Sequence, residues 1–328
     1  MTMTLDQLRC FVAVARSGHF TRAADGLGIA QPSLSRQVAA LERDVGARLF
    51  DRTPGAVTLS AAGETLLPVA VRMLEDRDAA YRRIEELTGL ARGRLRIGAT
   101  PSLCTSLIPD VIERYHDAHP GVDLHITEAG SGTLTESLAQ GELDLALVIA
   151  ERAVRNPALD LIPLLSEELV VVSSADRPAL TRRRAVTLSE VAGHALVLCH
   201  DGYDLRVALD RAFQDAGLQP HIVVEGAELD AVLRFVARGI GVTVAPVTAT
   251  LHYPGLRATR LTSPGLTRTI GLARRGGIDP SHAAVAFHSV LRECVVESAE
   301  GTTGLTLRIP DGAFGRTGRR SGRPHDRP

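Results

Sequence analysis

The chain has 328 residues, 45% of them hydrophobic, and a formal net charge of −1 at pH 7. This length predicts two or three domains, and the near-neutral charge excludes a protein that coats nucleic acid through overall basicity. No stretch approaches the ~20 apolar residues of a membrane span, and the N-terminus lacks a signal-peptide pattern, so we expect a cytoplasmic protein. The four cysteines form no metal-ligand pair, so we expect reduced thiols and no metal or cofactor.

Residues 20–50 predict two helices joined by a tight turn. Thr21 is a favourable N-cap for the first helix, residues 28–30 break the helical period, and Pro32 stands in the first turn of the second helix. The apolar stripe of the second helix consists of Leu34, Val38, Leu41 and Val45. This arrangement is typical of a helix-turn-helix, whose second helix inserts its N-terminal side chains into the DNA major groove.

Residues 49–59 follow the second helix and predict a β-hairpin around positions 53–55, which would form a wing. Arg52 on this wing could reach a phosphate or the adjacent minor groove. A helix pair rich in alanine and leucine can also be part of an ordinary helical core. DNA binding is favoured because the polar residues Gln31, Ser35 and Arg36 gather at the start of the second helix.

Residues 61–90 predict one long helix, followed by a short hinge at 89–93. The apolar seam of this helix consists of Leu66, Ala70, Met73, Tyr81, Ile84 and Leu87, interrupted by Arg77. Such a seam suits antiparallel pairing with a second copy of the chain, and the alternative is an amphipathic helix packed on its own domain. Pro68 is tolerable near the first turn or at a bend, since an interior proline costs ~3 kcal/mol.

From Arg94 onward, predicted strands and helices alternate, which indicates an α/β architecture. The expected strands are 95–98, 122–127, 144–149, 168–173, 195–199, 221–225, 242–245 and 268–273, and the expected helices are near 103–118, 134–141, 204–217, 229–239 and 280–296. The first three strands predict a parallel βαβαβ unit, and the whole predicts two lobes with two crossings, similar to a periplasmic-binding-protein fold. The Gly-, Pro- and Arg-rich tail from Glu300 is expected to be disordered and solvated.

The residues of the N-terminal part follow one long ungapped pattern. Its members are Ala24, Leu27, Gln31 to Ser35, Val38, Leu41, Glu42, Gly46, Leu49, Phe50, Arg52, Thr58 to Ser60, Ala62 and Gly63. This pattern resembles the N-terminal domain of LysR-type transcriptional regulators, and the resemblance extends from about Leu5 to about Glu297. It implies an α+β winged helix-turn-helix at 1–60, a dimerising linker helix at 61–91 and a two-lobed α/β effector-binding domain at 92–298. Lobe 1 would comprise about 92–162 and 267–298, lobe 2 about 163–266, and the tail 299–328.

The resemblance implies a sequence-specific DNA-binding transcriptional regulator that is controlled by a small-molecule effector and is not an enzyme. The expected DNA-contacting residues are Thr21, Gln31, Pro32, Ser33, Ser35, Arg36 and Arg52. The expected partners are double-stranded DNA, the effector and further copies of the chain in a dimer or tetramer. The alternative is a solute-binding α/β protein with an incidental helical N-terminus, which would bind a ligand but no DNA.

In a two-lobed α/β domain, ligands bind where strands end and helix N-termini converge. The residues at such places, and the predicted effector contacts, are Thr100, Ser102, Gly130, Ser131, Asp201, Gly202, Tyr203 and Gly226. Positive helix ends favour an organic anion, although Glu128, Asp201 and Glu225 lie nearby in the sequence. Ordinary helix capping is the alternative explanation for each serine and threonine.

One branch of the resembled family senses peroxide through a reactive cysteine in an Asp-Gly-His-Cys-Leu-Arg run, with a resolving cysteine on the following helix. This chain has Asp204 and Phe213 at those two places, and Cys199 has no partner nearby in the sequence. Because the chemistry needs a thiolate and a second thiol, a disulfide switch is not expected there.

Overall fold

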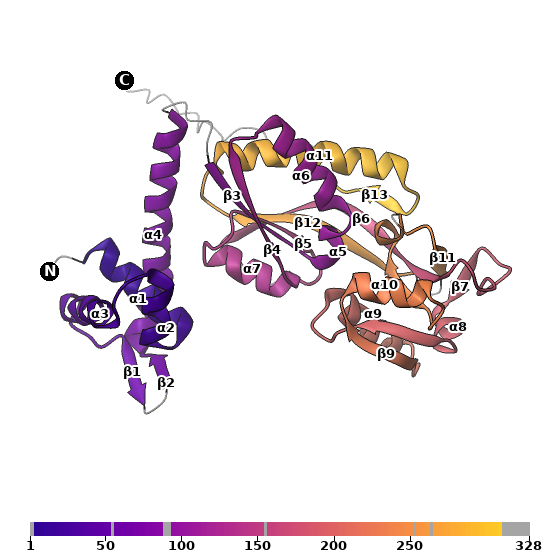
Figure 1. The fold of residues 1–328 in the computed structure, drawn as a ribbon, viewed down its shortest axis with the longest axis horizontal. Helices are drawn as coiled ribbons and strands as arrows, with labels where there is room; N and C mark the ends of the chain where they lie inside the picture. The colour runs from indigo at the N-terminus through magenta and orange to yellow at the C-terminus, as the bar shows by residue number, and fades with distance from the viewer. Residues whose placement is uncertain are drawn as a thin grey trace, which may run out of the picture.

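The computed structural model describes residues 3–53, 56–87, 93–153, 156–251, 253–262 and 265–309. A helical N-terminal part with a small hairpin continues into one long helix, and an α/β part in two lobes follows (Figure 1). Within the described ranges, no helix is both long and apolar enough to cross a membrane.

The N-terminal part is a winged helix-turn-helix, as predicted. Its elements are α1 (Leu5–Ser17), α2 (Phe20–Leu27), α3 (Gln31–Val45), β1 (Phe50–Thr53) and β2 (Ala56–Leu59). A capping box between Thr4 and Gln7 starts α1. Gly28 ends α2 in the left-handed conformation, with φ 66°, and this starts the tight turn before α3. Phe11, Leu34 and Val38 are fully buried in one core that joins these helices to the hairpin.

Two details of this domain differ from the sequence prediction. Thr21 is not an N-cap, because α2 already begins at Phe20 and the N-cap residue is His19. Val45 is 40% exposed although it continues the apolar stripe of α3. It is the last residue of the helix, and the chain turns away at Gly46, which has a positive φ of 73°.

The long helix α4 (Ala61–Leu87) contains Pro68 beyond its first turn. Ala70 and Val71 are buried in the core of the helix-turn-helix, so the first half of α4 packs on its own domain. Met73, one turn further, is 40% exposed. The side chains predicted to continue the seam at 81, 84 and 87, and residues 89–92 of the predicted hinge, lie outside the described parts of the chain. Gly93, the last residue of the predicted hinge, begins a strand instead.

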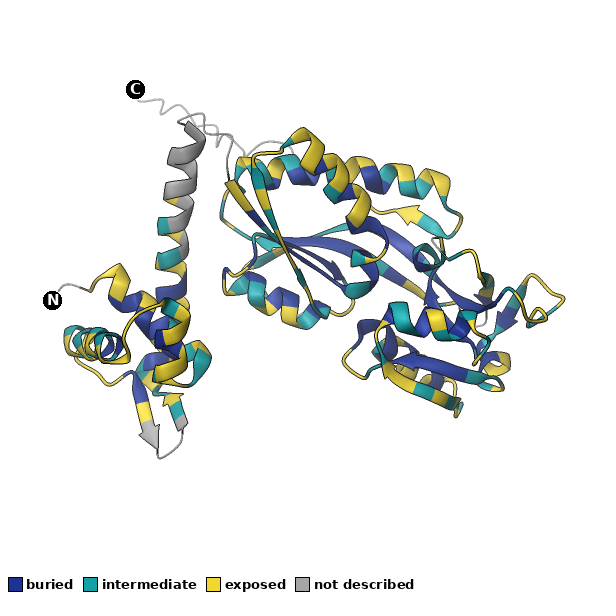
Figure 2. Cartoon of the chain, in the orientation of Figure 1, coloured by how far each residue is buried: buried dark blue, intermediate teal, exposed yellow. Residues whose placement is uncertain are grey.

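Lobe 1 is built on the predicted parallel unit of β3 (Gly93–Ala99), β4 (Val122–Glu128) and β5 (Leu145–Ile149). The helices α6 (Leu107–Ala118) and α11 (His282–Gly301) lie together on one face of this sheet, and α7 (Ser131–Ala139) lies on the other (Figure 1). Figure 2 shows the strands between them largely buried.

The helix predicted at 103–118 is interrupted, and a short α5 (Pro101–Cys104) precedes α6. The hydroxyls of Thr105 and Ser106 both donate to the carbonyl oxygen of Ser102, at 3.2 and 2.7 Å. These side-chain hydrogen bonds compete with the regular helical pattern, which explains the break between the two helices.

The strand β6 (Leu159–Ser174) runs through both lobes and is much longer than the predicted 168–173. Its first half pairs with β12 (Thr267–Arg275), and its second half pairs with β10 (Thr243–Pro246) and β11 (Leu256–Thr262). The two lobes therefore share one continuous hydrogen-bonded sheet.

The C-terminal segment contributes to this shared strand. β13 (Leu305–Leu307) pairs antiparallel with β6 at positions 165–167, and α11 extends to Gly301. The prediction of disorder from residue 299 is therefore wrong for 299–309, because β6 offers these residues an open strand edge that no local pattern reveals. Residues 310–328 lie outside the described part.

Lobe 2 encloses its own apolar core, separate from that of lobe 1. Its further elements are β7 (Ala185–Thr187), α8 (Leu188–Ala192), β8 (Ala195–Cys199), α9 (Asp204–Asp215), β9 (His221–Ala227), α10 (Leu229–Ala237) and the 3₁₀ helix η1 (Val247–Thr250). β8 and β9 pair in parallel, as the alternation of strands and helices predicts. Separate cores on one shared strand allow each lobe to behave as a rigid unit.

At the start of α4, the backbone of Gly63 packs closely against the backbone of Leu49. A Cβ atom on Gly63 would lie 2.2 Å from the carbonyl oxygen of Leu49, which is backbone and cannot rotate away. We expect Gly63→Ala to destabilise the DNA-binding domain by about 1–3 kcal/mol through overpacking. The measurement is the urea midpoint of the unfolding transition of this domain in the full-length protein.

Gly26→Ala is the matched control, because Gly26 lies in α2 and a Cβ there would meet nothing within 4 Å. This change should be neutral or stabilising by about 0.5–1 kcal/mol, since alanine favours the helix. Equal midpoints for the two variants would contradict the close contact.

Candidate effector cleft and DNA-binding helix

The predicted DNA-contacting residues of α3 lie on its first two turns. Gln31, Pro32 and Arg36 are exposed, whereas Ser33 and Ser35 are half-buried. The Gln31 amide donates to the hydroxyl of Ser35 at 3.0 Å, and Nε of Arg36 donates to the carbonyl oxygen of Pro32 at 3.3 Å. These contacts hold two long polar side chains along the helix surface.

The other two predicted DNA contacts lie on neighbouring elements. Thr21 is exposed in the first turn of α2, one helix before the recognition helix. The backbone of Arg52 pairs with Val57 in the hairpin, and its side chain lies outside those that the structure describes.

A cavity of about 210 Å³ lies between the two lobes. Its walls are Thr100, Pro101, Ser102, Glu128, Ala129, Gly130 and Ile149 from lobe 1, His200, Gly202, Tyr203, Asp204, Leu205 and Glu228 from lobe 2, and Arg268 from β12. The N-terminal ends of α5, α7, α9 and α10 all contribute to it. Five predicted effector residues, Thr100, Ser102, Gly130, Gly202 and Tyr203, therefore meet in one place.

Three predicted effector residues do not line this cavity. Ser131 is fully buried just behind the wall. The side chain of Asp201 is 92% exposed and lies 3.5 Å from Arg206, because α9 begins only at Asp204. Gly226 belongs to β9, and the residue that caps α10 and reaches the cavity is Glu228.

A carboxylate of lobe 2 contacts a helix N-terminus of lobe 1 across the cleft. Oδ2 of Asp204 accepts hydrogen bonds from the backbone N–H of Ser131 at 3.0 Å and from its hydroxyl at 2.5 Å. The Ser131 hydroxyl also accepts from the N–H of Ile149 at 2.8 Å. Asp204 thus caps α7 from the opposite lobe, where the helix dipole favours a negative charge.

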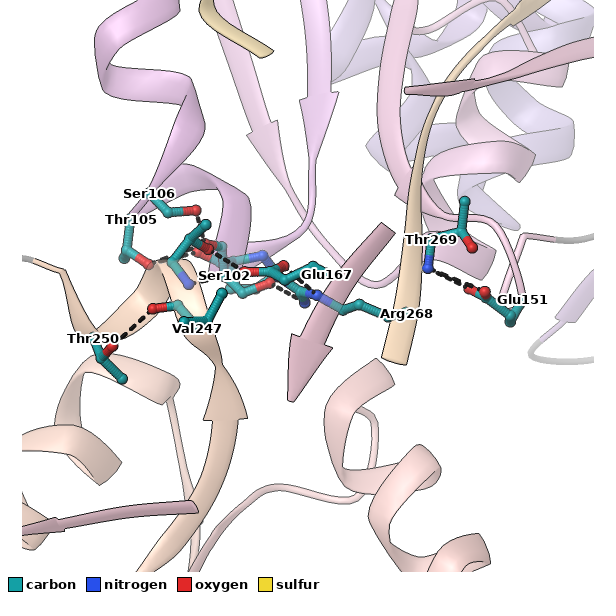
Figure 3. A network of polar contacts seen from close by, with 11 residues as sticks. Ser102, Thr105, Ser106, Glu151, Glu167, Val247, Thr250, Arg268 and Thr269 are labelled. Atoms are coloured by element: carbon teal, nitrogen blue, oxygen red, sulfur yellow. Dashed lines mark hydrogen bonds and ion pairs between the residues drawn. The ribbon is translucent and has the colours of Figure 1, made fainter. Parts of the chain in front are cut away.

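A buried ion pair stands where the lobes cross, at the directly paired residues Arg268 and Glu167 (Figure 3). The side chains are 7% and 0% exposed. Nε of Arg268 donates to Glu167 at 2.9 Å, and Nη1 donates to the hydroxyl of Ser102 at 2.7 Å. Glu167 also accepts from the N–H of Thr248 at 2.9 Å. The pair therefore connects β6, β12, α5 and η1.

Two residues that line the cavity, Thr100 and Tyr203, carry buried hydroxyls. Among the residues that the structure describes, the Thr100 hydroxyl has no hydrogen-bond partner, whereas the Tyr203 hydroxyl lies beside the backbone N–H of Leu229. A buried polar group without a partner costs free energy, so such groups mark places where a ligand can supply one. Burial is the main cause that raises the pKa of Tyr203 above its ordinary value, so its phenol is neutral.

The cysteines nearest to the cavity are protonated at neutral pH. Burial, together with nearby carboxylates, raises the pKa of Cys104 and of Cys199 to about 12. Asp204 engages Ser131, and Phe213 is buried in the core of lobe 2. Among the residues that the structure describes, no three His, Cys, Asp or Glu side chains are placed to hold a metal ion.

Comparison with known families identifies both parts of the chain. Residues 5–64 match the family of bacterial regulatory helix-turn-helix proteins of the lysR type, and residues 88–295 match the LysR substrate binding domain. This chain belongs to the LysR family of transcriptional regulators. It is therefore a DNA-binding regulator with an effector-binding domain, and members of this family are not enzymes.

Individual relatives span nearly the whole chain. An uncharacterised transcriptional regulator YybE of Bacillus subtilis is 35% identical, covering 83% of this chain and 92% of the relative. A probable hydrogen peroxide-inducible genes activator of Streptomyces viridosporus is 33% identical, covering 89% and 94%. A full-length OxyR structure from Pseudomonas aeruginosa is 28% identical with a TM-score of 0.67, covering 90% and 95%.

Several residues of the cleft were not predicted as effector contacts from the sequence. Arg268 and its partner Glu167 lie 101 positions apart, and Asp204 lies 73 positions from Ser131, which the sequence did predict. The one available signal was a charged residue just ahead of a short apolar run of the strand, as at Arg268 before residues 270–273 in β12. Such a residue in a buried strand indicates a partner, but not which one.

The ion pair generates a stability prediction. Glu167→Gln leaves the buried guanidinium of Arg268 without its counter-charge, so we expect a loss of about 3 kcal/mol. Glu168→Gln removes the neighbouring pair with Arg260, which is largely exposed, and should cost at most about 1 kcal/mol. The measurement is the urea midpoint of the effector-domain transition. A smaller effect at Glu167 than at Glu168 would contradict the role of the buried pair.

Proposed function

We propose that this LysR-family protein is a sequence-specific regulator in the cytoplasm, whose DNA binding is biased by a small effector held in the cleft between its lobes. The observation that carries the proposal is the convergence on one cavity of four helix N-termini and the buried hydroxyl of Thr100, which has no hydrogen-bond partner among the described residues. The same chain presents an exposed polar first turn on the second helix of a helix-turn-helix.

For DNA, we propose that Gln31, Pro32, Ser33, Ser35 and Arg36 of α3 contact base edges or the groove. Thr21 and Arg52 are proposed to contact the backbone on either side of the recognition helix. Support comes from the placement of the five α3 residues at the N-terminal end of the helix, the end that enters the major groove in this motif.

For the effector, we propose contacts with Thr100, Ser102, Gly130, Gly202 and Tyr203, with Ser131 acting from behind the wall. Thr100 offers a buried hydroxyl that has no hydrogen-bond partner in the described parts of the chain, and Tyr203 adds a second buried hydroxyl. The sequence also predicted an organic anion, and this stays a prediction.

We propose that the protein functions as a dimer through α4, and that dimers can associate into tetramers. Support comes from Val69 and Met73, which are 42% and 40% exposed and lie four residues apart on one face of this helix. Exposed large apolar residues at that spacing suit a helix partner.

The proposal as a whole is tested by binding the purified protein to the DNA upstream of its own gene, with and without a panel of metabolites. We expect a retarded complex at low salt whose affinity or mobility changes with one metabolite. Absence of any retarded complex at low salt would overturn the proposal.

Base reading is tested by Arg36→Ala. If Arg36 contacts a base edge, its loss should cost ~1–3 kcal/mol of discrimination between the operator and a scrambled duplex. Arg43→Ala is the control, because Arg43 is exposed at the far end of the same helix. It should leave the discrimination unchanged. A footprint that keeps its sequence preference after Arg36→Ala would remove this role.

The cleft is tested by Thr100→Val, which removes one unpartnered hydroxyl while keeping the β-branched shape. We expect the apo protein to melt at the same or a higher temperature, because a buried unsatisfied group is lost. The metabolite response of DNA binding should weaken about tenfold, since one hydrogen bond to the effector is missing. An unchanged response would show that the effector does not contact Thr100.

A further inference from the structure

The cleft carries exposed carboxylates on both of its walls. Glu128 stands at the end of β4 in lobe 1, and Glu228 caps the start of α10 in lobe 2. Both are exposed, and both line the cavity between the lobes. Burial is the main cause that raises the pKa of Tyr203, and the negative charges of Glu228 and Glu128 add to it.

The positive groups around the cavity are already engaged elsewhere. Arg268 is buried against Glu167, and Nε of Arg152 lies 3.6 Å from Asp204. Nε2 of His200 lies 3.5 Å from Glu228, while its Nδ1 accepts from the N–H of Gly202, so both ring nitrogens already have partners. Within the described residues, Glu128 forms no ion pair, and its nearest named contact is the thiol of Cys104.

An anionic ligand would find little positive charge here. The N-terminus of α7 is capped by the carboxylate of Asp204. Glu228 stands at the N-cap position of α10 without a side-chain cap hydrogen bond, and Asp230 lies in the first turn of that helix, so both add negative charge near its N-terminus. These groups occupy the places where a bound anion would gain from a helix dipole. This charge balance argues against the anion that the sequence predicted.

We propose that the effector is a small organic cation, an alkylammonium or guanidinium compound, whose charged nitrogen binds between Glu128 and Glu228. Its remaining atoms would meet the unpartnered hydroxyl of Thr100 on the cleft wall. The cavity of about 210 Å³ suits a molecule of this kind. An organic cation fits better than a metal ion, because the described residues include no set of three metal-ligating side chains. The proposal rests on the proposed function of the cleft as the effector site.

The position of Glu128 and Glu228 also suggests how a bound cation would close the cleft between the lobes. They belong to opposite lobes, so without a ligand their like charges oppose closure of the cleft. A cation bound between them attracts both carboxylates, and this attraction replaces the repulsion and favours closure. The strand β6 passes through both lobes and pairs with β12 at Glu167 and Arg268, so the change in lobe position is carried by the crossing that holds this pair.

The test uses the full-length protein and two measurements, thermal unfolding and titration calorimetry. The cationic probes are butylammonium, agmatine and phenethylammonium, and the matched probes are butyrate, butanol and hydrocinnamate at equal ionic strength. We expect at least one cation to raise the melting temperature saturably, while the anions and the alcohol do not.

The variants Glu128→Gln and Glu228→Gln should each weaken binding of the responding cation about tenfold, and the double variant should abolish it. The double variant should melt at the same or a higher temperature without ligand, because the repulsion is removed. Glu293→Gln, an exposed position on α11 away from the cleft, is the control and should bind like the parent protein.

Three outcomes overturn the proposal: no cation in the set raises the melting temperature, an anion does so instead, or cation binding survives in the double variant. Gel retardation of DNA by the same samples tests the proposed regulatory function separately from the cation site. Cation binding without any retarded DNA complex would overturn the proposed regulatory function and keep the cation site. A retarded DNA complex without cation binding would keep the regulatory function and overturn the cation site.

Discussion

The buried ion pair between Glu167 and Arg268 is the constraint on which the effector domain depends. Two charges at almost zero exposure are tolerable only because each has several hydrogen-bond partners. The residues stand opposite each other on β6 and β12, the strands through which the lobes cross. Since Arg268 also holds Ser102 at the start of α5, the crossing and one wall of the cleft are fixed by the same side chain.

The hydrogen bonds between Asp204 and Ser131 also join the two lobes, but they differ from the ion pair at the crossing. Asp204 reaches from lobe 2 to the start of α7 in lobe 1, with Ser131 as donor. Unlike the pair at the crossing, this contact joins surfaces that separate when the cleft opens. The domain therefore combines a permanent connection at the crossing with hydrogen bonds between Asp204 and Ser131 that can break. A ligand-dependent change in lobe position requires both kinds of connection.

The core of the DNA-binding domain is built from α1, α2, α3, the hairpin and the first half of α4, and it is separate from both lobes. Because these cores are separate, the proposed signal from the cleft would pass as a rigid-body displacement of one part against another. The exposed apolar residues of α4 suit this view, because they make the helix available to a second copy of the chain. In such a dimer, the spacing of the two recognition helices would follow from the relative position of the rigid parts.

The sequence by itself determined the helix-turn-helix, the long helix, the parallel unit of lobe 1 and the placement of Thr100, Ser102, Gly130 and Tyr203. These features depend on local signals: apolar periodicity, Gly28 at a positive φ, Pro32 in a first turn, and polar residues where a strand ends and a helix begins.

Only the tertiary structure decided which charges face each other. Glu167 meets Arg268, Asp204 meets Ser131, and Glu128 and Glu228 line one cavity, because a long strand and two crossings bring distant segments together. The same holds for β13, which is a strand only because β6 offers it an edge. No pattern within a few residues records such pairings, because their free energy depends on burial and on partners distant in the chain.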